Sequence, residues 1–326
     1  MGAYLETPIT AKDSHSGANK DGSVRFGHSS MQGWRKGMED SHIAIPELAM
    51  VGSKEIGMYA VFDGHGGAEV AKYCQKHLPN AIRAVPQWRL QEWKNALCAS
   101  FHSIDRELQT IEAQRELKVL IGLDPAEADA EAATIQTRNA AAASSAGDPQ
   151  TKNLQQMMVM KRMLQGGRVS AGGGAEGDNR VCRLPDHPVH AGCTAVVCLK
   201  VGNTLYVANA GDSRGVLCRD GEAVPLSYDH KPNSEIETNR IVNAGGFITE
   251  ANGHFRINGN LNLSRSIGDL KYKQNSSLRP EEQMITAEPD VIQMTLTAMD
   301  EFMVLACDGI WDVMSNEEAV AFARER

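Results

Sequence analysis

The sequence predicts an α+β protein in which two antiparallel sheets pack together and helices flank them. Short strand patterns follow one another between residues 194 and 218 with no helical pattern between them, which favours an antiparallel sheet. Helical patterns precede this group at 68–85 and 91–108, and others follow it. Grouped strands with helices before and after them are typical of sheets packed face to face under outer layers of helix.

Length and charge set the first limits on function. The chain has 326 residues, enough for one large domain or two small ones, and 42% of them are hydrophobic, which suffices for a sizeable core. The formal net charge of −8 and the lack of a dense Lys/Arg run argue against binding to a phosphate backbone, so we expect no nucleic-acid partner. No stretch approaches the ~18 consecutive apolar residues of a membrane-spanning helix.

The cysteines point to a reducing compartment. None forms a Cys-x-x-Cys pair and most lie among apolar residues, so we expect reduced core thiols in a cytoplasmic or nuclear protein. No Cys is followed six positions later by Arg, which leaves no candidate for a phosphatase with a cysteine nucleophile. The seven cysteines lie at positions 74, 98, 182, 193, 198, 218 and 307.

Residues 1–22 are polar with scattered Gly, Ser and Asn, and predict a flexible N-terminal lead-in to a single domain over 23–326. Met1-Gly2 nearly fits the myristoylation pattern, but Glu6 stands where Ser or Thr is required. Acylation of Gly2 stays open, and one acyl chain would tether the protein to a membrane only weakly.

The first half of the domain predicts two strands and two helices. Residues 35–45 are expected to lie along one strand, and Met58–Phe62 has the length and the apolar, aromatic character of a buried strand. Helix-forming residues follow over 68–85. The second helix, at 91–108, has apolar residues every three or four positions, which are expected in the core. These residues are Trp93, Leu97, Phe101, Ile104 and Leu108.

The second half predicts further strands and two more helices. Asp220-Gly221 is a good hairpin turn, and Asn233 or Ser234 can cap a helix. Phe302–Ala306 has the character of a final buried strand. The other predicted elements are strands at 194–199, 205–209 and 215–218, a helix that ends at Asn243, and a helix that begins at Asn316.

Between about 112 and 190 the composition changes to that of a low-complexity insertion in the domain. Residues 124–150 are rich in Ala with Ser, Gly and Asp, and 166–178 contains three consecutive glycines, so both predict linker or poorly ordered chain. Between them, the Leu and Met residues from Leu154 to Leu164 fall on one helical face. This face is either a helix docked on the body or an adaptable surface for a protein partner.

The segment Asp63-Gly64-His65-Gly66-Gly67 ends the Met58–Phe62 strand and offers metal-binding chemistry. Its glycines let the backbone bend sharply and leave the Asp63 carboxylate and the Gly64 carbonyl available to hold an ion. For this segment alone, an ordinary tight turn with a solvated Asp and His is an equally good interpretation.

Four other segments change that balance, because each follows or ends an apolar segment and supplies an Asp. They are Arg35–His42, Gly211–Gly215, Ser264–Asp269 and Ala306–Asp312. With them, the sequence strongly resembles the PP2C family of metal-dependent protein serine/threonine phosphatases, in the right order over 24–106 and 191–326. The resemblance implies a four-layered α-β-β-α sandwich of two antiparallel sheets flanked by helices.

The resemblance also has a gap at the C-terminal end. Family members continue beyond the strand before Asp308 to another strand with an Asp-Asn pair, whose Asp is a further metal ligand, and this chain ends before it. The resemblance therefore predicts a C-terminally truncated fold. Either the sequence is a shortened product, or a family-like fold persists without full metal binding.

The resemblance assigns roles to individual positions. Asp63 matches the ligand that bridges two metal ions, Gly64 a carbonyl ligand, and Asp308 a direct ligand. Arg35 matches the phosphate-binding arginine, and His65 the proposed general acid. The remaining matches are Glu39 and Asp40, which hold waters around the ions, Asp212 and Asp312, which share a weaker third metal site with Asp308, and Asp269 in a corner nearby.

Clustered carboxylates and a backbone carbonyl, without a set of His or thiolate ligands, select hard cations, hence Mg²⁺ or Mn²⁺. Two ions and a weaker third are implied. The predicted function is hydrolysis of phosphoserine and phosphothreonine in phosphoprotein substrates by a metal-activated water. The alternative is a non-catalytic phosphatase-like protein that binds phosphoproteins or acts as a scaffold, because the final metal-ligand strand is absent.

Overall fold

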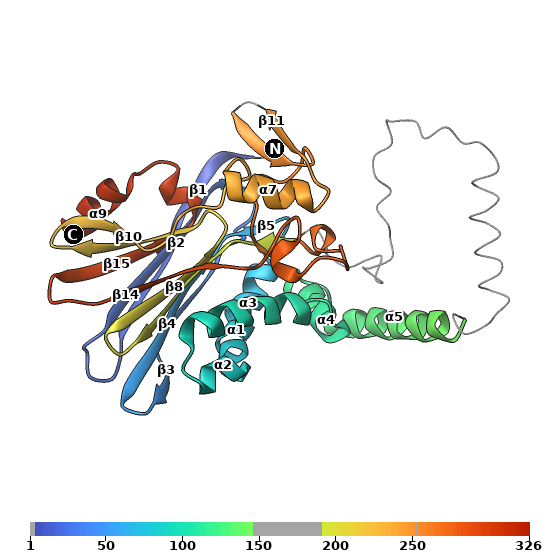
Figure 1. Cartoon of the computed structure of the whole chain (residues 1–326), viewed down its shortest axis with the longest axis horizontal. Coiled ribbons are helices and arrows are strands. Elements are labelled where there is room, and N and C mark those ends of the chain that lie inside the picture. Colours follow the sequence, from blue (N-terminus) through green and yellow to red (C-terminus); the bar gives the residue numbers. More distant parts are fainter. Residues whose placement is uncertain (1–3, 146–190, 252) are drawn as a thin grey trace. The chain divides into compact units, whose positions relative to one another are not determined.

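The computed structural model describes residues 4–145, 191–251 and 253–326. The chain divides into two compact units, one formed by residues 1–108 with 189–326 and the other by 109–188. The second unit falls close to the low-complexity insertion expected at about 112–190. Figure 1 shows the described residues, coloured along the sequence from blue to red.

The larger sheet of the first unit has five antiparallel strands in the order β14-β8-β7-β4-β3. β7 lies at its centre and is buried along almost its whole length, as expected of a nearly continuous apolar run covered on both faces. The predicted strands at 194–199 and 205–209 are confirmed as β7 and β8. The five strands are β3 (Ser41–Val51), β4 (Lys54–Phe62), β7 (Ala195–Val201), β8 (Thr204–Ala210) and β14 (Asp290–Thr295).

Helices cover one face of this sheet. α1 (Glu69–Ala84) packs on β3 and β4, and α3 (Trp93–Glu107) packs on β8 and β14, with the short α2 (Pro86–Arg89) between them (Figure 1). The expected apolar stripe of α3 is buried, from Trp93 to Ile104. Both predicted helices of the first half are therefore confirmed, to within about two residues at each end.

The smaller sheet has the strand order β10-β9-β15 and joins β9 (Arg214–Arg219), β10 (Glu222–Pro225) and β15 (Asp300–Ala306). The predicted turn is confirmed: Asp220 and Gly221 both have positive φ angles, 50° and 81°, as a two-residue hairpin turn of type I′ requires. The final strand, expected to be buried, is half-buried, because β15 is an edge strand in the described part of the chain.

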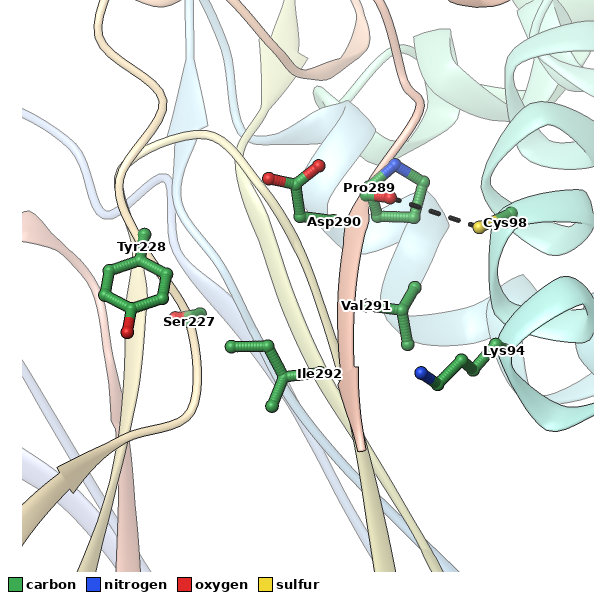
Figure 2. A pocket seen from close by; sticks show the side chains of 8 residues that line it. All are labelled: Lys94, Cys98, Ser227, Tyr228, Pro289, Asp290, Val291 and Ile292. Carbon is green, nitrogen blue, oxygen red and sulfur yellow. Dashed lines mark hydrogen bonds between the residues drawn. The ribbon is translucent and has the colours of Figure 1, made fainter. Parts of the chain in front are cut away.

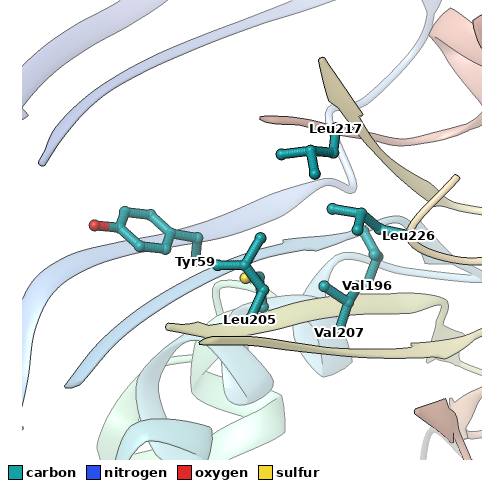
Figure 3. Close-up of a cluster of buried hydrophobic side chains, with 7 residues drawn as sticks. Tyr59, Val196, Leu205, Val207, Leu217 and Leu226 are labelled. Carbon is teal, nitrogen blue, oxygen red and sulfur yellow. The ribbon is translucent and has the colours of Figure 1, made fainter. Parts of the chain in front are cut away.

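The hydrophobic core lies between these two sheets. Tyr59, Val196 and Val207 project from the five-stranded sheet, and Leu217 of β9 meets them from the other side (Figure 3). Alternation along each strand sends every second side chain into this layer. The partly buried Met303 and Leu305 of β15 pack against the same cluster. Face-to-face burial of apolar side chains therefore holds the sandwich together.

The outer face of the smaller sheet is covered by α8 (Asp308–Trp311) and α9 (Asn316–Arg324). Trp311 and Val320 pack there on Val216 and Cys218 of β9. The side chain of Ser315 caps α9 by accepting a hydrogen bond from the Glu318 N–H at 3.1 Å. The layers are thus helix, sheet, sheet and helix, which confirms the predicted fold class.

A lobe of loops and short elements follows β10 in the sequence. α7 (Glu235–Asn243) and the hairpin β11–β12 (Ile248–Ala251 and His254–Ile257) share a small apolar core with Ile285. α7 follows Ser234 as predicted, although the Ser234 side chain makes no capping hydrogen bond. Two 3₁₀ turns, η1 (Leu270–Tyr272) and η2 (Pro280–Glu282), complete this region.

A buried network of charged groups ties α7 to the loops around it. Glu237 is 1% exposed, and its carboxylate accepts hydrogen bonds from Arg265 at 2.7 and 3.0 Å and from Arg240 at 2.7 Å. Arg265 also donates to the Asp290 carboxylate at 2.9 Å. Every charge in this network has an opposite charge beside it, which buried charges need.

Two predictions near the N-terminus are wrong. The flexible lead-in expected over 1–22 is instead the strand β1 (Tyr4–Ala18), paired antiparallel with β2 (Arg25–Arg35). Backbone hydrogen bonds hold this ribbon without an apolar alternation that the sequence could reveal. The single strand expected over 35–45 is also divided, because β2 ends at Arg35 and β3 begins only at Ser41.

The second unit contains two described helices, α4 (Ile111–Leu120) and α5 (Pro125–Ser145). They contact each other, and ion pairs join Arg115 to Asp129 and Lys118 to Glu131. The expectation of linker over 124–150 is therefore wrong for Pro125–Ser145, where the high helix propensity of Ala prevails. The apolar helical face expected over 154–164 and the glycine-rich stretch at 166–178 lie outside the described residues. Within the described residues, no helix is long and apolar enough to cross a membrane.

Candidate active site

Strand pairing brings two predicted site carboxylates together. In the β3–β4 ladder Ser41 is the partner of Phe62, so Asp40 and Asp63 lie side by side just past the paired residues. The Asp63 carbonyl accepts a hydrogen bond from the Thr194 N–H at 2.9 Å, which fixes the corner to the neighbouring chain. Both carboxylates therefore sit where adjacent strands end, as the sequence predicts for Asp63.

Asp40, Asp63 and Cys307 form a compact group at this corner, because one ligand atom of each lies within 4.8 Å of the others. The Cys307 thiol donates to Oδ2 of Asp40 at 3.4 Å. Asp308, the first residue of α8, lies close enough to Asp63 for each carboxyl group to shift the pKa of the other. The short connection from β15 into α8 thus carries Asp308 to the corner formed by β3 and β4.

Electrostatics in this group disfavour several negative charges at once. Burial, together with repulsion by Asp40, Asp308 and Asp212, raises the pKa of Asp63 to about 9. Burial likewise raises the pKa values of Asp40 and Asp308 above their ordinary range. A divalent cation would reverse this effect by supplying the missing positive charge.

The donor atoms of the site fit a hard cation. Burial and the nearby Asp40 and Asp63 raise the pKa of the Cys307 thiol far above its ordinary value, so the thiol stays neutral and serves as a hydrogen-bond donor. Carboxylate and carbonyl oxygens are then the available ligands, and Mg²⁺ and Mn²⁺ prefer oxygen.

Asp212 and Asp312, expected at a weaker third site, also lie near this group, and both act electrostatically on Asp308. Asp212 is 2% exposed, and its Oδ2 accepts a hydrogen bond from the Lys231 ammonium at 2.6 Å. Lys231 belongs to a loop with no metal-site pattern, so no feature of the sequence indicates that it neutralises Asp212.

Gly64 and Glu39 are positioned by close backbone approach. A Cβ atom on Gly64 would run into the backbone carbonyl of Glu39, so only glycine allows the two segments to meet this closely. Gly64 is buried and pairs with Cys193 in the short sheet of β5 (Gly64–His65), β6 (Gly192–Cys193) and β13 (Ile267–Gly268).

His65 of β5 forms a tight pair with Asp269, the residue that follows β13. His65 Nε2 lies 2.6 Å from Oδ2 of Asp269, which also accepts a hydrogen bond from the Ser266 hydroxyl at 2.6 Å. Burial lowers the pKa of His65, but Asp269 outweighs it, so the pKa lies above its ordinary value. Nδ1 of His65 is buried and has no hydrogen-bond partner among the described residues. A Cβ on Gly192 would run into both side chains of the pair, so the absence of a side chain there makes room for them.

Arg35 is exposed at the end of β2, where its positive charge acts on Asp40. Another buried acid was not predicted: Glu69, at the start of α1, is 3% exposed, and its Oε2 has no hydrogen-bond partner among the described residues. Burial raises the pKa of Glu69 above its ordinary value. The Gly66-Gly67 pair just before α1 is a signal for close packing, since a Cβ on Gly67 would collide with the Glu69 carboxylate.

A cavity of about 440 Å³ lies apart from these groups (Figure 2). It contains none of the predicted site residues. Burial raises the pKa of the Cys98 thiol at its wall to about 12, so this thiol is not a ready nucleophile. The residues that line the cavity are Lys94, Cys98, Ser227, Tyr228, Pro289, Asp290, Val291 and Ile292.

Comparison with known proteins identifies the class to which this chain belongs. A family model described as "Protein phosphatase 2C" matches residues 24–151 and 141–326. The chain is 39% identical over 334 residues to "Probable protein phosphatase 2C 21" of Arabidopsis thaliana, covering 100% of this chain and 82% of that protein. It is 38% identical over 328 residues to "Protein phosphatase 2C homolog 3" of Schizosaccharomyces pombe, covering 99% of this chain and 59% of that protein.

Solved structures share the fold. The serine-threonine phosphatase 2C of Toxoplasma gondii superposes with a TM-score of 0.59 at 17% identity, covering 99% of this chain and 86% of that one. A C. elegans sex determining protein superposes with a TM-score of 0.56 at 21% identity, covering 98% of this chain and 56% of that one. The fold is that of PP2C-type phosphatases. The chain belongs to the protein phosphatase 2C family.

Proposed function

We propose that the protein hydrolyses phosphoserine and phosphothreonine in protein substrates and depends on Mg²⁺ or Mn²⁺. The observation that carries this proposal is the cluster of Asp40, Asp63 and Asp308, whose pKa values are raised by burial in a group of acids. Membership of a protein phosphatase family supports the reaction class and the phosphoprotein substrates. Repulsion among these buried acids destabilises the ion-free protein. A bound cation would offset that repulsion, so this arrangement is expected at a cation site.

The residues divide into groups that would hold the ions. Asp63 and Asp308 would be direct ligands with the Gly64 carbonyl, and Glu39 and Asp40 would hold waters around the ions. Asp212 and Asp312 would hold the weaker third ion. Since Lys231 already neutralises Asp212 at 2.6 Å, that ion would have to compete with an ammonium group, which fits weak binding. When bound, the ions would neutralise charge on the phosphoryl oxygens and activate water.

Two side chains would act on the substrate. Arg35 is exposed at the end of β2, where its planar guanidinium group could bind two phosphoryl oxygens. His65 would protonate the leaving alkoxide from Nδ1, because Asp269 occupies Nε2, and the ring would have to turn to bring the buried Nδ1 to the substrate. Asp269 would act as a positioning residue that orients the ring and favours its protonated form.

A metal-dependence assay tests the proposal. The full chain should release phosphate from phosphoserine and phosphothreonine peptides with Mg²⁺ or Mn²⁺, lose this activity in EDTA, and regain it when the ion is restored. A non-catalytic phosphoprotein-binding protein would instead retain phosphopeptides without turnover. The phosphatase names of the relatives give that alternative no support. Binding without metal-stimulated release of phosphate would refute the proposed activity.

Replacement of Arg35 by alanine should raise KM for phosphopeptides on the order of tenfold, because one charge-assisted contact to the phosphoryl group is lost. If the contact tightens in the transition state, kcat also falls. Steady-state kinetics measure both effects. Arg25→Ala, at the exposed opposite end of β2, is the matched control and should leave both constants unchanged. An unchanged kcat/KM in Arg35→Ala would remove Arg35 from the site.

Replacement of Asp269 by asparagine should lower kcat about ten- to a hundredfold, less than the ~10²–10⁴-fold of general acid catalysis as a whole, because His65 itself remains. The substitution also removes the charge that raises the pKa of His65. The limb of the kcat–pH profile where His65 loses its proton should therefore move to lower pH. A purely structural role for Asp269 predicts a lower kcat with an unmoved limb, and that result would contradict the assignment.

A further inference from the structure

Three histidines from three strands form a cluster that shares no residue with the acidic cluster. His15 of β1 and His28 of β2 are direct partners in the antiparallel ladder, and His42 is the second residue of β3. One ring nitrogen of each lies within 4.8 Å of the others. His15 is exposed, whereas His28 and His42 are half-buried. Strand pairing thus brings His15 and His28 together, whereas His42 lies on the edge strand of the five-stranded sheet and meets them where β2 packs near β3.

The distances in the group suit a shared ligand better than a hydrogen bond. Nε2 of His15 and Nε2 of His42 are 3.4 Å apart, longer than the ~2.7–3.2 Å of a good hydrogen bond. Two nitrogens bound at ~2.0–2.1 Å to a tetrahedral Zn²⁺ lie about 3.3–3.4 Å apart. Nδ1 of His28 is buried and has no partner among the described residues, so one nitrogen in the group still needs a contact.

The rings must rearrange to share an ion. His28 and His42 are stacked, with centroids 3.3 Å apart and planes at 11°, while His15 is tilted by 40° and 37° to them. A ligated ion lies near the plane of each ring, so the stacked pair has to open. Without an ion, the same three rings would form a simple stacked cluster, which is the rival explanation of their proximity.

The chemistry of this group differs from that of the acidic cluster. Imidazole nitrogens favour Zn²⁺ and similar transition-metal ions, whereas carboxylate oxygens favour Mg²⁺ and Mn²⁺. Burial and the neighbouring His15 lower the pKa of His28, which favours the neutral form that binds metals. The negative charge of Asp13 acts on both His28 and His42, and would offset part of the charge of a bound cation.

We propose that His15, His28 and His42 form a Zn²⁺ site that is separate from the acidic cluster, with water as the fourth ligand on the exposed side of His15. A bound ion would link the β1–β2 ribbon to β3. Since Arg35 ends β2 and Asp40 directly precedes β3, this link would restrict the movement of both strand ends beside the acidic cluster. The proposal does not depend on the proposed phosphatase activity.

Zn²⁺ titration of the full chain in excess Mg²⁺ tests the site. Calorimetry on an Asp63→Asn background reduces Zn²⁺ binding at the acidic cluster, and the excess Mg²⁺ competes for the acids that remain. We expect one Zn²⁺ per chain, and zinc-edge absorption should show about three nitrogen ligands at ~2.0–2.1 Å. His28→Gln removes one ligand and should weaken Zn²⁺ binding on the order of a hundredfold. Loss of a group that only hydrogen-bonds to a ligand already costs about 10–100-fold in metal affinity.

Two further variants make the result decisive. His15→Gln alters an exposed side chain and should weaken binding similarly even if His28→Gln folds poorly. His254→Gln, which removes an exposed imidazole from β12, is the matched control and should bind Zn²⁺ like the parent. Zn²⁺ affinity that changes less than twofold in both His28→Gln and His15→Gln would overturn the proposal, as would the absence of a stoichiometric site in the parent.

Discussion

Asp63→Asn is expected to lower metal-dependent kcat about a thousandfold or more. Asp63 lies between Asp40 and Asp308 in the acidic cluster, and as the bridging ligand it would contact both ions. Loss of its charge removes several kcal/mol of metal-assisted stabilisation of the transition state, and each ~1.4 kcal/mol is a factor of ten in rate. Phosphopeptide turnover measured over a range of Mn²⁺ concentrations gives the loss directly.

The same substitution should not harm the fold. Burial and repulsion by the neighbouring acids raise the pKa of Asp63 to about 9. This carboxyl group therefore destabilises the folded state at neutral pH when no ion is bound. In EDTA, the Tm of Asp63→Asn should therefore equal or exceed that of the parent. Asp220→Asn is the matched control, because Asn tolerates the left-handed turn conformation and this position is remote from the acids. Parent-like activity in Asp63→Asn would refute the metal assignment.

Glu237→Ala should reduce the free energy of unfolding by about 3–5 kcal/mol, because it leaves the buried guanidinium groups of Arg240 and Arg265 without their shared carboxylate. This is a large share of the ~5–15 kcal/mol that stabilises a typical domain. Urea unfolding at pH 7 measures it. Glu301→Ala breaks an exposed ion pair with Arg324, 2.9 Å long, and should cost only about 0–1 kcal/mol.

The effect should depend on pH with a definite sign. Burial raises the pKa of Glu237, but hydrogen bonds and charges from Arg265 and Arg240 prevail and hold it below its ordinary value. The stabilisation is then complete above the unfolded-state pKa of about 4.3 and is lost as the pH falls through the lower folded-state pKa. The difference between parent and Glu237→Ala should shrink below about pH 4. A difference under about 1 kcal/mol at pH 7 would show that solvent already stabilises the two arginines.

The parts of the fold that sequence predicts are those with a strong apolar pattern. β7, β8 and α3 each have such a pattern, and their predicted positions are confirmed. β1 escapes prediction because its backbone pairing with β2 requires no apolar face. The sequence does not distinguish α5 from linker, because an Ala-rich composition suits low-complexity chain as well as helix.

The site divides in the same way. Asp40 and Asp63 follow from the motifs and the strand ends, and the structure places them together. The partners that set the charge state of Asp212 and His65 come from elsewhere in the chain. Lys231 reaches Asp212, and Asp269 reaches His65, across distances in sequence that no local pattern spans. Charge neutralisation within a site is a tertiary property, and motif spacing alone does not contain it.

The pairing of β4 with β7 has a consequence for how the chain can vary and fold. These neighbouring strands are separated in sequence by α1, α3 and the whole of residues 109–188. The entropy of closing such a loop grows only logarithmically with its length, so halving residues 109–188 would change the closure free energy by at most about 0.6 kcal/mol. The equilibrium stability of the sandwich therefore depends little on the length of the insertion. The folding rate depends on it more, because β4 and β7 must pair across a long separation in sequence, and such pairings form slowly.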